Sequence, residues 1–199
     1  ADLRTVDQVL SEFQPEVVFH LAAQPLVRES YRSPLVTWRS NVMGTATILE
    51  AIRSHRCVKA CVVATSDKCY ENREQIWGYR EGDALGGHDP YSASKGSAEL
   101  AVASWRRSYF SDGSCLVASA RAGNVIGGGD RAAERLVVEF IEAMERGEPL
   151  RIRRPAATRP WQHVLEPLSG YLWLGAQLFT AGASVAEAWN FGPDPRNVV

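Results

Sequence analysis

Tyr91 and Lys95 are the side chains of this sequence that are best spaced for acid–base chemistry. They stand four residues apart in a segment that reads as a helix beginning after Pro90, so they share one helical face. A nearby ammonium favours the phenolate and lowers the pKa of a tyrosine, which makes the phenol a usable acid or base at neutral pH. The pair therefore predicts redox chemistry on a sugar or an alcohol.

A second group of reactive side chains follows the apolar run 57–64, which predicts a buried strand. Ser66 either caps a turn or holds a substrate oxygen through its hydroxyl. Asp67 and Lys68 form either a solvated ion pair or a separate acid and base, each tuned by burial. We expect the catalytic role in both cases, because open parallel sheets bind ligands at the carboxyl ends of their strands.

The elements that must position these side chains alternate between short β-rich runs and longer helical patterns. We expect strands at residues 17–23, 57–64, 116–120, 151–154 and 188–191. We expect helical segments at residues 7–13, 35–53, 91–110, 132–146 and 164–179. This order predicts the α/β class, with a Rossmann-like, doubly wound parallel sheet that is truncated at both ends.

Composition narrows the class of protein. The 199 residues make about one domain, and the formal net charge of −1 gives no basic field for nucleic acid or a membrane surface. No apolar stretch approaches the roughly 20 residues of a membrane span, and no signal-peptide pattern opens the chain. The four cysteines show no CxxC pair, so we expect reduced, buried thiols, no metal site and a cytoplasmic enzyme.

Several strings in this sequence resemble the extended short-chain dehydrogenase/reductase family, also described as NAD-dependent epimerases and dehydratases. They are residues 19–28, 65–72, 91–95, 121–130 and 159–164, and the resemblance covers essentially the whole chain. The adjacent Asp67 and Lys68 are its specific part and point to the nucleotide-sugar 4,6-dehydratases, since simple epimerases have no such pair. Arg131 departs from the family, which often has a tryptophan there.

The resemblance implies a reaction on CDP-glucose with NAD as cofactor. Tyr91, assisted by Lys95, would take the C4 hydroxyl proton while hydride passes to NAD+, and Ser66 would hold that oxygen. Lys68 and Asp67 would remove the C5 proton and protonate the departing C6 hydroxyl. Return of the hydride to C6 would give CDP-4-keto-6-deoxyglucose and regenerate NAD+.

The same resemblance implies binding residues and partners. The cofactor contacts would be Asp2, Leu3, Ala22, Ala23, Ser40, Tyr91 and Lys95. The nucleotide-sugar contacts would be Gln24, Asn124 and Arg159. Residues 1–126 would form a partial NAD-binding domain, and residues 127–199 a partial substrate-binding region whose strands return to the main sheet. Helices 35–53 and 91–110 would pair across a homodimer as a four-helix bundle.

Two alternatives remain at this level. A nucleotide-sugar 4-epimerase or reductase would need Tyr91 and Lys95 but would give Asp67 and Lys68 no role. A non-catalytic fragment is the other, because no strand followed by GxGxxG supplies the usual pyrophosphate cradle and both ends look cut. Arg121 is equally open between a structural role and a contact to a diphosphate.

Overall fold

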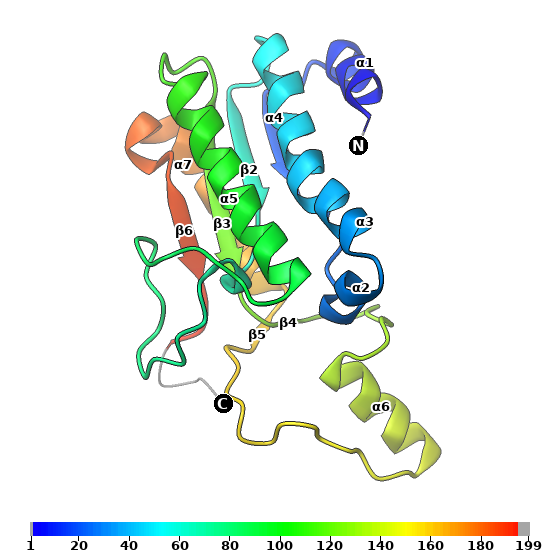
Figure 1. Ribbon diagram of the computed structural model, residues 1–199. Coiled ribbons are helices and arrows are strands. Elements are labelled where there is room, and N and C mark those ends of the chain that lie inside the picture. The colour runs from blue at the N-terminus through cyan, green and yellow to red at the C-terminus, as the bar shows by residue number, and fades with distance from the viewer. Residues whose placement is uncertain (1, 195–199) are drawn as a thin grey trace.

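Four parallel strands form the main sheet in the computed structural model, which describes residues 2–194 (Figure 1). Their order is β1-β2-β3-β6, and every pairing is parallel. The strands are β1 (Val17–His20), β2 (Ala60–Ala64), β3 (Leu116–Ala122) and β6 (Ala188–Phe191). The predicted α/β class with a Rossmann-like parallel sheet is confirmed.

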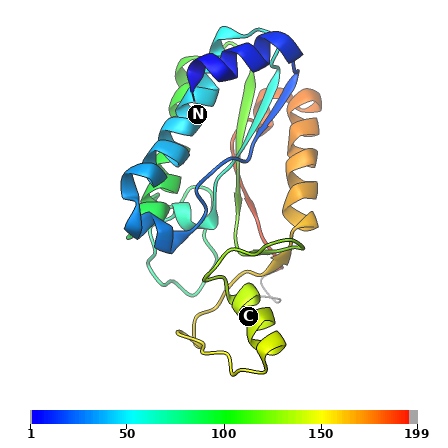
Figure 2. The same ribbon diagram turned by 90° about the vertical axis from the view of Figure 1, so that its right-hand side faces the viewer.

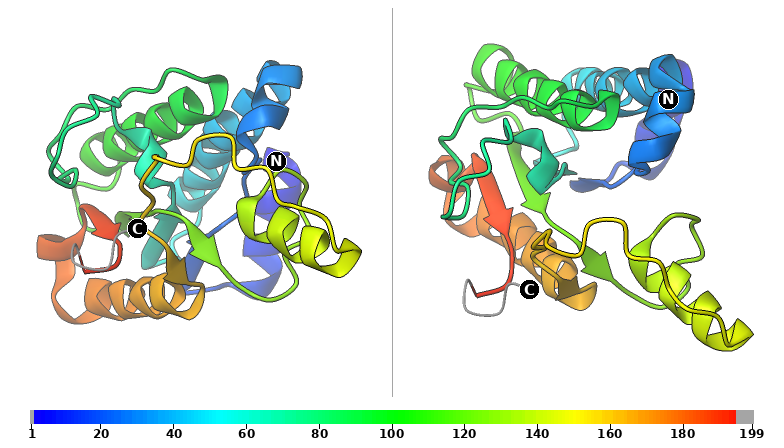
Figure 3. Two further views of the ribbon diagram at one scale, coloured as in Figure 1. Left: turned by 90° about the horizontal axis from the view of Figure 1, so that it is seen from below. Right: turned by 60° about the horizontal axis from the view of Figure 1, so that its bottom comes forward.

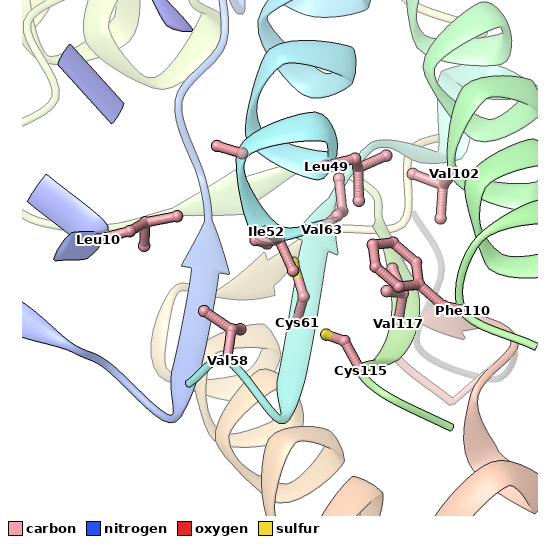
Figure 4. Packing of buried hydrophobic residues seen from close by; sticks show 11 residues of the cluster. Leu10, Leu49, Ile52, Val58, Cys61, Val63, Val102, Phe110, Cys115 and Val117 are labelled. Carbon is pink, nitrogen blue, oxygen red and sulfur yellow. The ribbon is translucent and has the colours of Figure 1, made fainter. Parts of the chain in front are cut away.

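Helices cover both faces of this sheet (Figure 2). One face carries α1 (Leu3–Phe13), α4 (Gly44–Ser54) and α5 (Pro90–Ser108), and the other carries α7 (Leu165–Thr180). Strand β2 is buried on both sides, which explains its continuous apolar run. Cys61 and Val63 pack toward α4 and α5 (Figure 4), whereas Ala60 and Val62 pack toward α7.

The predicted helix 35–53 is one helical run with an irregular centre. It consists of α3 (Pro34–Trp38), the π-helical segment η1 (Arg39–Met43) and α4. Asn41 lies in the π-helical segment and is buried, with its side-chain amide paired to both backbone groups of Gln24. β1 ends at His20 instead of residue 23, and the loop that follows it is bonded at Gln24 to a side chain and not to a strand.

Other predicted boundaries also moved. The strand predicted at 57–64 begins at Ala60, and the helix predicted at 132–146 is α6 (Leu136–Arg146). The strand predicted at 151–154 is wrong, since these residues are irregular and exposed and pair with no strand among residues 2–194. The sequence reasoning missed α2 (Val27–Arg32), the short pair β4 (Val125–Ile126) and β5 (Gln162–His163), and the 3₁₀ turns η2 (Asp67–Cys69) and η3 (Gly182–Val185).

The segment between β3 and α7 extends beyond the carboxyl end of the main sheet (Figures 1 and 3). It contains β4, α6 and β5, after which α7 and β6 return to the sheet. The predicted division into residues 1–126 and 127–199 stays a prediction, and residues 1 and 195–199 lie outside the described part.

Three of the four cysteines are buried, as expected for core thiols. Burial raises the pKa of Cys69 and of Cys115 to about 12 and raises that of Cys61 further. Within residues 2–194, no three His, Cys, Asp or Glu side chains group in a way that could hold a metal ion. None of the helices in that part is long and apolar enough to cross a bilayer.

Candidate active site

The candidate site forms where the tip of β2 meets the first turns of α5. Ser66 starts the 3₁₀ turn η2, with its Oγ accepting the Lys68 N–H at 3.2 Å and donating to Asp67 Oδ1 at 3.0 Å. The Ser66 side chain also faces the phenol of Tyr91 and acts to lower its pKa. Ser66 therefore caps a turn and faces the phenol, and its role in holding a substrate oxygen stays a prediction.

Tyr91 is buried, with 7% of its surface exposed. Burial raises the pKa of its phenol, and the nearby Ser66 side chain opposes this shift only in part. The prediction that Lys95 lowers the Tyr91 pKa is therefore wrong for this chain by itself. The physical reason is that removing a phenolate from water outweighs the favourable neighbours.

Lys95 is buried one turn along α5, and burial lowers its pKa to about 8, with Glu99 opposing the shift. Its positive charge also acts on His20 at the end of β1. Burial and this charge lower the His20 pKa to about 4, and its Nε2 lies 3.2 Å from Thr45 Oγ1. His20 is therefore neutral at pH 7 and holds the end of β1 against α4.

Asp67 and Lys68 form a half-exposed ion pair beside Ser66. Lys68 Nζ lies 3.3 Å from Asp67 Oδ1, and the side chains are 37% and 33% exposed. A Cβ on Gly123 would lie 3.2 Å from Asp67 Oδ2 and 2.6 Å from Pro160. Glycine at this position thus lets the loop after β3 approach the carboxylate, and an acid and a base stand together at the rim of the site.

The predicted substrate contacts differ in their availability. Asn124 has a buried Oδ1 with no hydrogen-bond partner among the described residues, so it has an acceptor to offer a ligand. Arg159 is exposed and donates to the neighbouring Thr158 carbonyl at 2.7 Å. The Gln24 amide is already committed, since it donates to Leu26 and Thr37 and accepts the Leu26 N–H.

The predicted cofactor contacts fall into two groups. Ala22 and Ala23 follow β1 directly, and Ser40 lies next to Asn41 in the π-helical segment that is bonded to the same loop. Asp2 and Leu3 open α1, which packs on α4 and places Asp7 against His55 at the far end of that helix. The structure does not place Asp2 and Leu3 beside Ser66 and Tyr91.

Arg121 has a structural role, which resolves the alternative left open above. Only 4% exposed, its guanidinium donates to Glu99 Oε2 and to the Tyr70 hydroxyl, both at 2.7 Å. Burial acts to lower the pKa of Arg121, but pairing with Glu99 raises it above its ordinary value. Its charge is therefore satisfied inside the protein.

Sequence reasoning missed two residues that support the site. Glu99 follows Lys95 by four residues, and this helical spacing was a usable signal. Ser30 accepts the backbone N–H of Tyr91 at 3.1 Å and so caps the first turn of α5 from α2. No sequence pattern indicated Ser30, because the helix that carries it was itself missed.

Comparisons with known proteins identify the family of the chain. The family model described as GDP-mannose 4,6 dehydratase matches residues 1–182. CDP-glucose 4,6-dehydratase of Salmonella typhimurium is 51% identical over 197 residues, which cover 96% of this chain and 55% of that protein. The chain thus spans about half the length of this curated relative.

Solved structures share the fold as well. The dTDP-glucose 4,6-dehydratase DesIV from Streptomyces venezuelae, solved with NAD bound, aligns with a TM-score of 0.80 at 25% identity, over 96% of this chain and 55% of that one. UDP-glucose 4-epimerase from Thermotoga maritima, solved with UDP-glucose, aligns with a TM-score of 0.81 at 26% identity, over 96% and 60%. The fold alone therefore does not separate a dehydratase from an epimerase.

Proposed function

The chain belongs to the family described as GDP-mannose 4,6 dehydratases, and on that premise we propose that it is the central part of an NAD-dependent CDP-glucose 4,6-dehydratase. The enzyme would oxidise the sugar at C4, eliminate water across C5 and C6, and reduce C6. The relative that is 51% identical supports CDP-glucose as the substrate.

The observation that carries this proposal is that the Asp67–Lys68 pair lies beside Ser66 and Tyr91. Asp67 Oδ1 accepts from Ser66, and both Ser66 and Asp67 lie close enough to Tyr91 to shift the pKa of its phenol. A dehydratase needs an acid and a base for water elimination next to the group that handles the C4 hydroxyl. A 4-epimerase has no use for this pair.

The buried end of the site fits a cofactor that carries hydroxyl groups. Lys95 is only 5% exposed and lies one turn after Tyr91 on α5, so its ammonium can donate hydrogen bonds to acceptors of a ligand bound beside the phenol. A bound ribose would supply such acceptors. Tyr91, Lys95, Ala22, Ala23 and Ser40 would hold NAD, which would supply the temporary oxidation at C4.

The residues of this chain then divide the proton transfers. Tyr91 takes the C4 hydroxyl proton, and it needs nearby positive charge to do so because burial raises its pKa. Ser66 holds the C4 oxygen by its hydroxyl. Of Lys68 and Asp67, one removes the C5 proton and the other protonates the departing C6 hydroxyl. The C4 ketone makes the C5 proton acidic enough to be removed. Each proton-transfer group contributes on the order of 10²–10⁴ in rate.

We also propose that the working protein is a cytoplasmic homodimer. Large apolar side chains are exposed on the run from α3 to α4 and on α5, including Leu35 at 75%, Val36 at 56% and Leu100 at 61%. A second copy of the chain that packs helices 35–53 and 91–110 against the same helices would cover them. Four free thiols fit a reducing compartment.

The test uses the complete protein that carries this sequence, incubated with CDP-glucose and NAD. We expect a product lighter by one water, with a C4 ketone and a C6 methyl group visible by NMR. Lys68→Ala should retain the binding of CDP-glucose and abolish water loss. A C4 epimer made by both proteins would instead support the epimerase alternative, and no turnover by the wild type would support a non-catalytic role.

A further inference from the structure

Two separate elements supply the groups of the candidate site, and one buried carboxylate joins them. Ser66 follows β2, whereas Tyr91 belongs to α5. Thr65, the residue before Ser66, donates its hydroxyl hydrogen to Glu99 Oε1 on α5 in a short hydrogen bond. Glu99 is one turn beyond Lys95, so this contact lies beside the site but outside it.

Two further donors besides Thr65 hold the Glu99 carboxylate. Its side chain is 3% exposed, and its Oε2 accepts from Ser119 Oγ at 2.8 Å and from Arg121 at 2.7 Å. Both of these donors belong to β3. The carboxylate is therefore fixed from the sheet, and its other oxygen is directed to Thr65.

Thr65 directly follows β2, and its backbone still pairs with β3. Its N–H donates to the Ala120 carbonyl of β3 at 2.8 Å, after which Ser66 leads into the 3₁₀ turn. The Thr65 hydroxyl also lies 3.4 Å from the same carbonyl, farther than from Glu99. The side chain thus ties the tip of β2 to α5 at the position where the chain leaves the sheet.

We propose that the Thr65–Glu99 hydrogen bond sets the spacing between the tip of β2 and α5, so that Thr65 and Glu99 are positioning residues for Ser66 and Tyr91. The activity part of this inference rests on the proposed function. A displacement of about 1 Å between reacting groups can lower a rate on the order of 10²-fold, so a contact that touches no substrate can still govern turnover.

The test compares Thr65→Val with two matched variants of the complete protein. Thr65→Val keeps the shape and removes the donor, while Glu99 keeps its bonds to Ser119 and Arg121. We expect kcat to fall roughly 10- to 100-fold with little change in KM, and Thr65→Ser to restore it. Ser119→Ala removes a different hydroxyl from the same carboxylate and should leave kcat near the wild-type value. Equal kcat for Thr65→Val and wild type, or an equal loss in Ser119→Ala, would overturn the inference.

A second readout does not depend on activity. Crystal structures of the wild type, Thr65→Val and Ser119→Ala should show a longer separation between Ser66 Oγ and Tyr91 Oη only in Thr65→Val. If the wild type fails to convert CDP-glucose, the proposed function fails, and this separation alone decides the inference. An unchanged separation in Thr65→Val refutes it.

Discussion

Lys95 lies one helical turn after Tyr91 on α5, and burial moves their pKa values in opposite directions. The Lys95 pKa falls to about 8, and the Tyr91 pKa rises above its ordinary value. The ammonium therefore loses its proton before the phenol does when the chain is alone. On the proposed function, the positive charge of an oxidised nicotinamide would favour the phenolate and so oppose the effect of burial.

The buried charge of Lys95 predicts a gain in stability on its removal. Lys95→Met should raise the free energy of unfolding at pH 7 by up to roughly 3 kcal/mol, because a shift from 10.5 to about 8 disfavours the charged form. The unfolded state binds the extra proton between pH 8 and 10.5, so wild-type stability from this group rises across that window. Urea unfolding at pH 7 and pH 10.5 tests this, with exposed Lys59→Met as control. An equal gain at both pH values would contradict it.

His20 predicts a loss of stability in mild acid. Its pKa is lowered from 6.5 to about 4 in the folded protein, first by burial and then by Lys95. Its contribution is thus complete above pH 6.5 and is lost as pH falls toward 4, up to roughly 3 kcal/mol. His20→Gln should flatten this slope in urea unfolding between pH 7 and 4, whereas His88→Gln, in an exposed loop, should not. A wild-type slope retained by His20→Gln would count against this assignment.

We expect that removing the phenol hydroxyl of Tyr91 gives a protein that folds but turns over little substrate. Tyr91→Phe keeps the backbone N–H bond to Ser30 and loses only the contact to Ser66. We expect turnover of CDP-glucose to fall on the order of 10²–10⁴-fold, with Tm changed by only a few degrees. Steady-state kinetics and calorimetry measure both quantities. Tyr109→Phe, half exposed at the end of α5, is the control, and turnover by Tyr91→Phe within tenfold of wild type would remove Tyr91 from the mechanism.

Much of this arrangement was predictable from sequence, because local patterns encode it. The apolar run of β2 and the spacing of Tyr91 and Lys95 indicated a strand tip facing a helix. Parallel pairing then places Ser66 near Tyr91, since the carboxyl ends of the strands meet at one edge. The strand and the helical spacing were predictable because each depends on neighbours in the chain, and the general rule for parallel sheets supplied the rest.

The remaining features depend on contacts between distant residues. The raised pKa of Tyr91 follows from how deeply α5 is buried, which spacing does not report. The loop after β1 is bonded at Gln24 to Asn41, from a π-helical segment that no composition signal marked. The prediction of a strand at 151–154 was wrong because a strand needs a partner strand, and a local pattern of polar and apolar residues does not show whether one is present.

Gly96, next to Lys95 on α5, leaves no room for a larger side chain. A Cβ there would lie 2.9 Å from the Gly86 carbonyl oxygen and 3.1 Å from that of Cys69, and both are backbone atoms that cannot rotate away. Gly96→Ala gains about 1 kcal/mol of helix propensity but overpacks a contact that typically costs 1–3 kcal/mol. We therefore expect a net loss of about 1 kcal/mol and reduced turnover, because the displaced residues adjoin the turn after Ser66.

A matched control for Gly96→Ala is Gly78→Ala, where a new Cβ would meet no atom within 4 Å. Urea unfolding and kcat of both variants separate the contact from the general effect of replacing a glycine. Loss of stability in Gly96→Ala alone, with a lowered kcat, supports close packing between α5 and the loop after η2 as a condition for the site. Increased stability in Gly96→Ala would mean that this loop yields easily, and the tip of β2 would then have to be held from β3 and Glu99 alone.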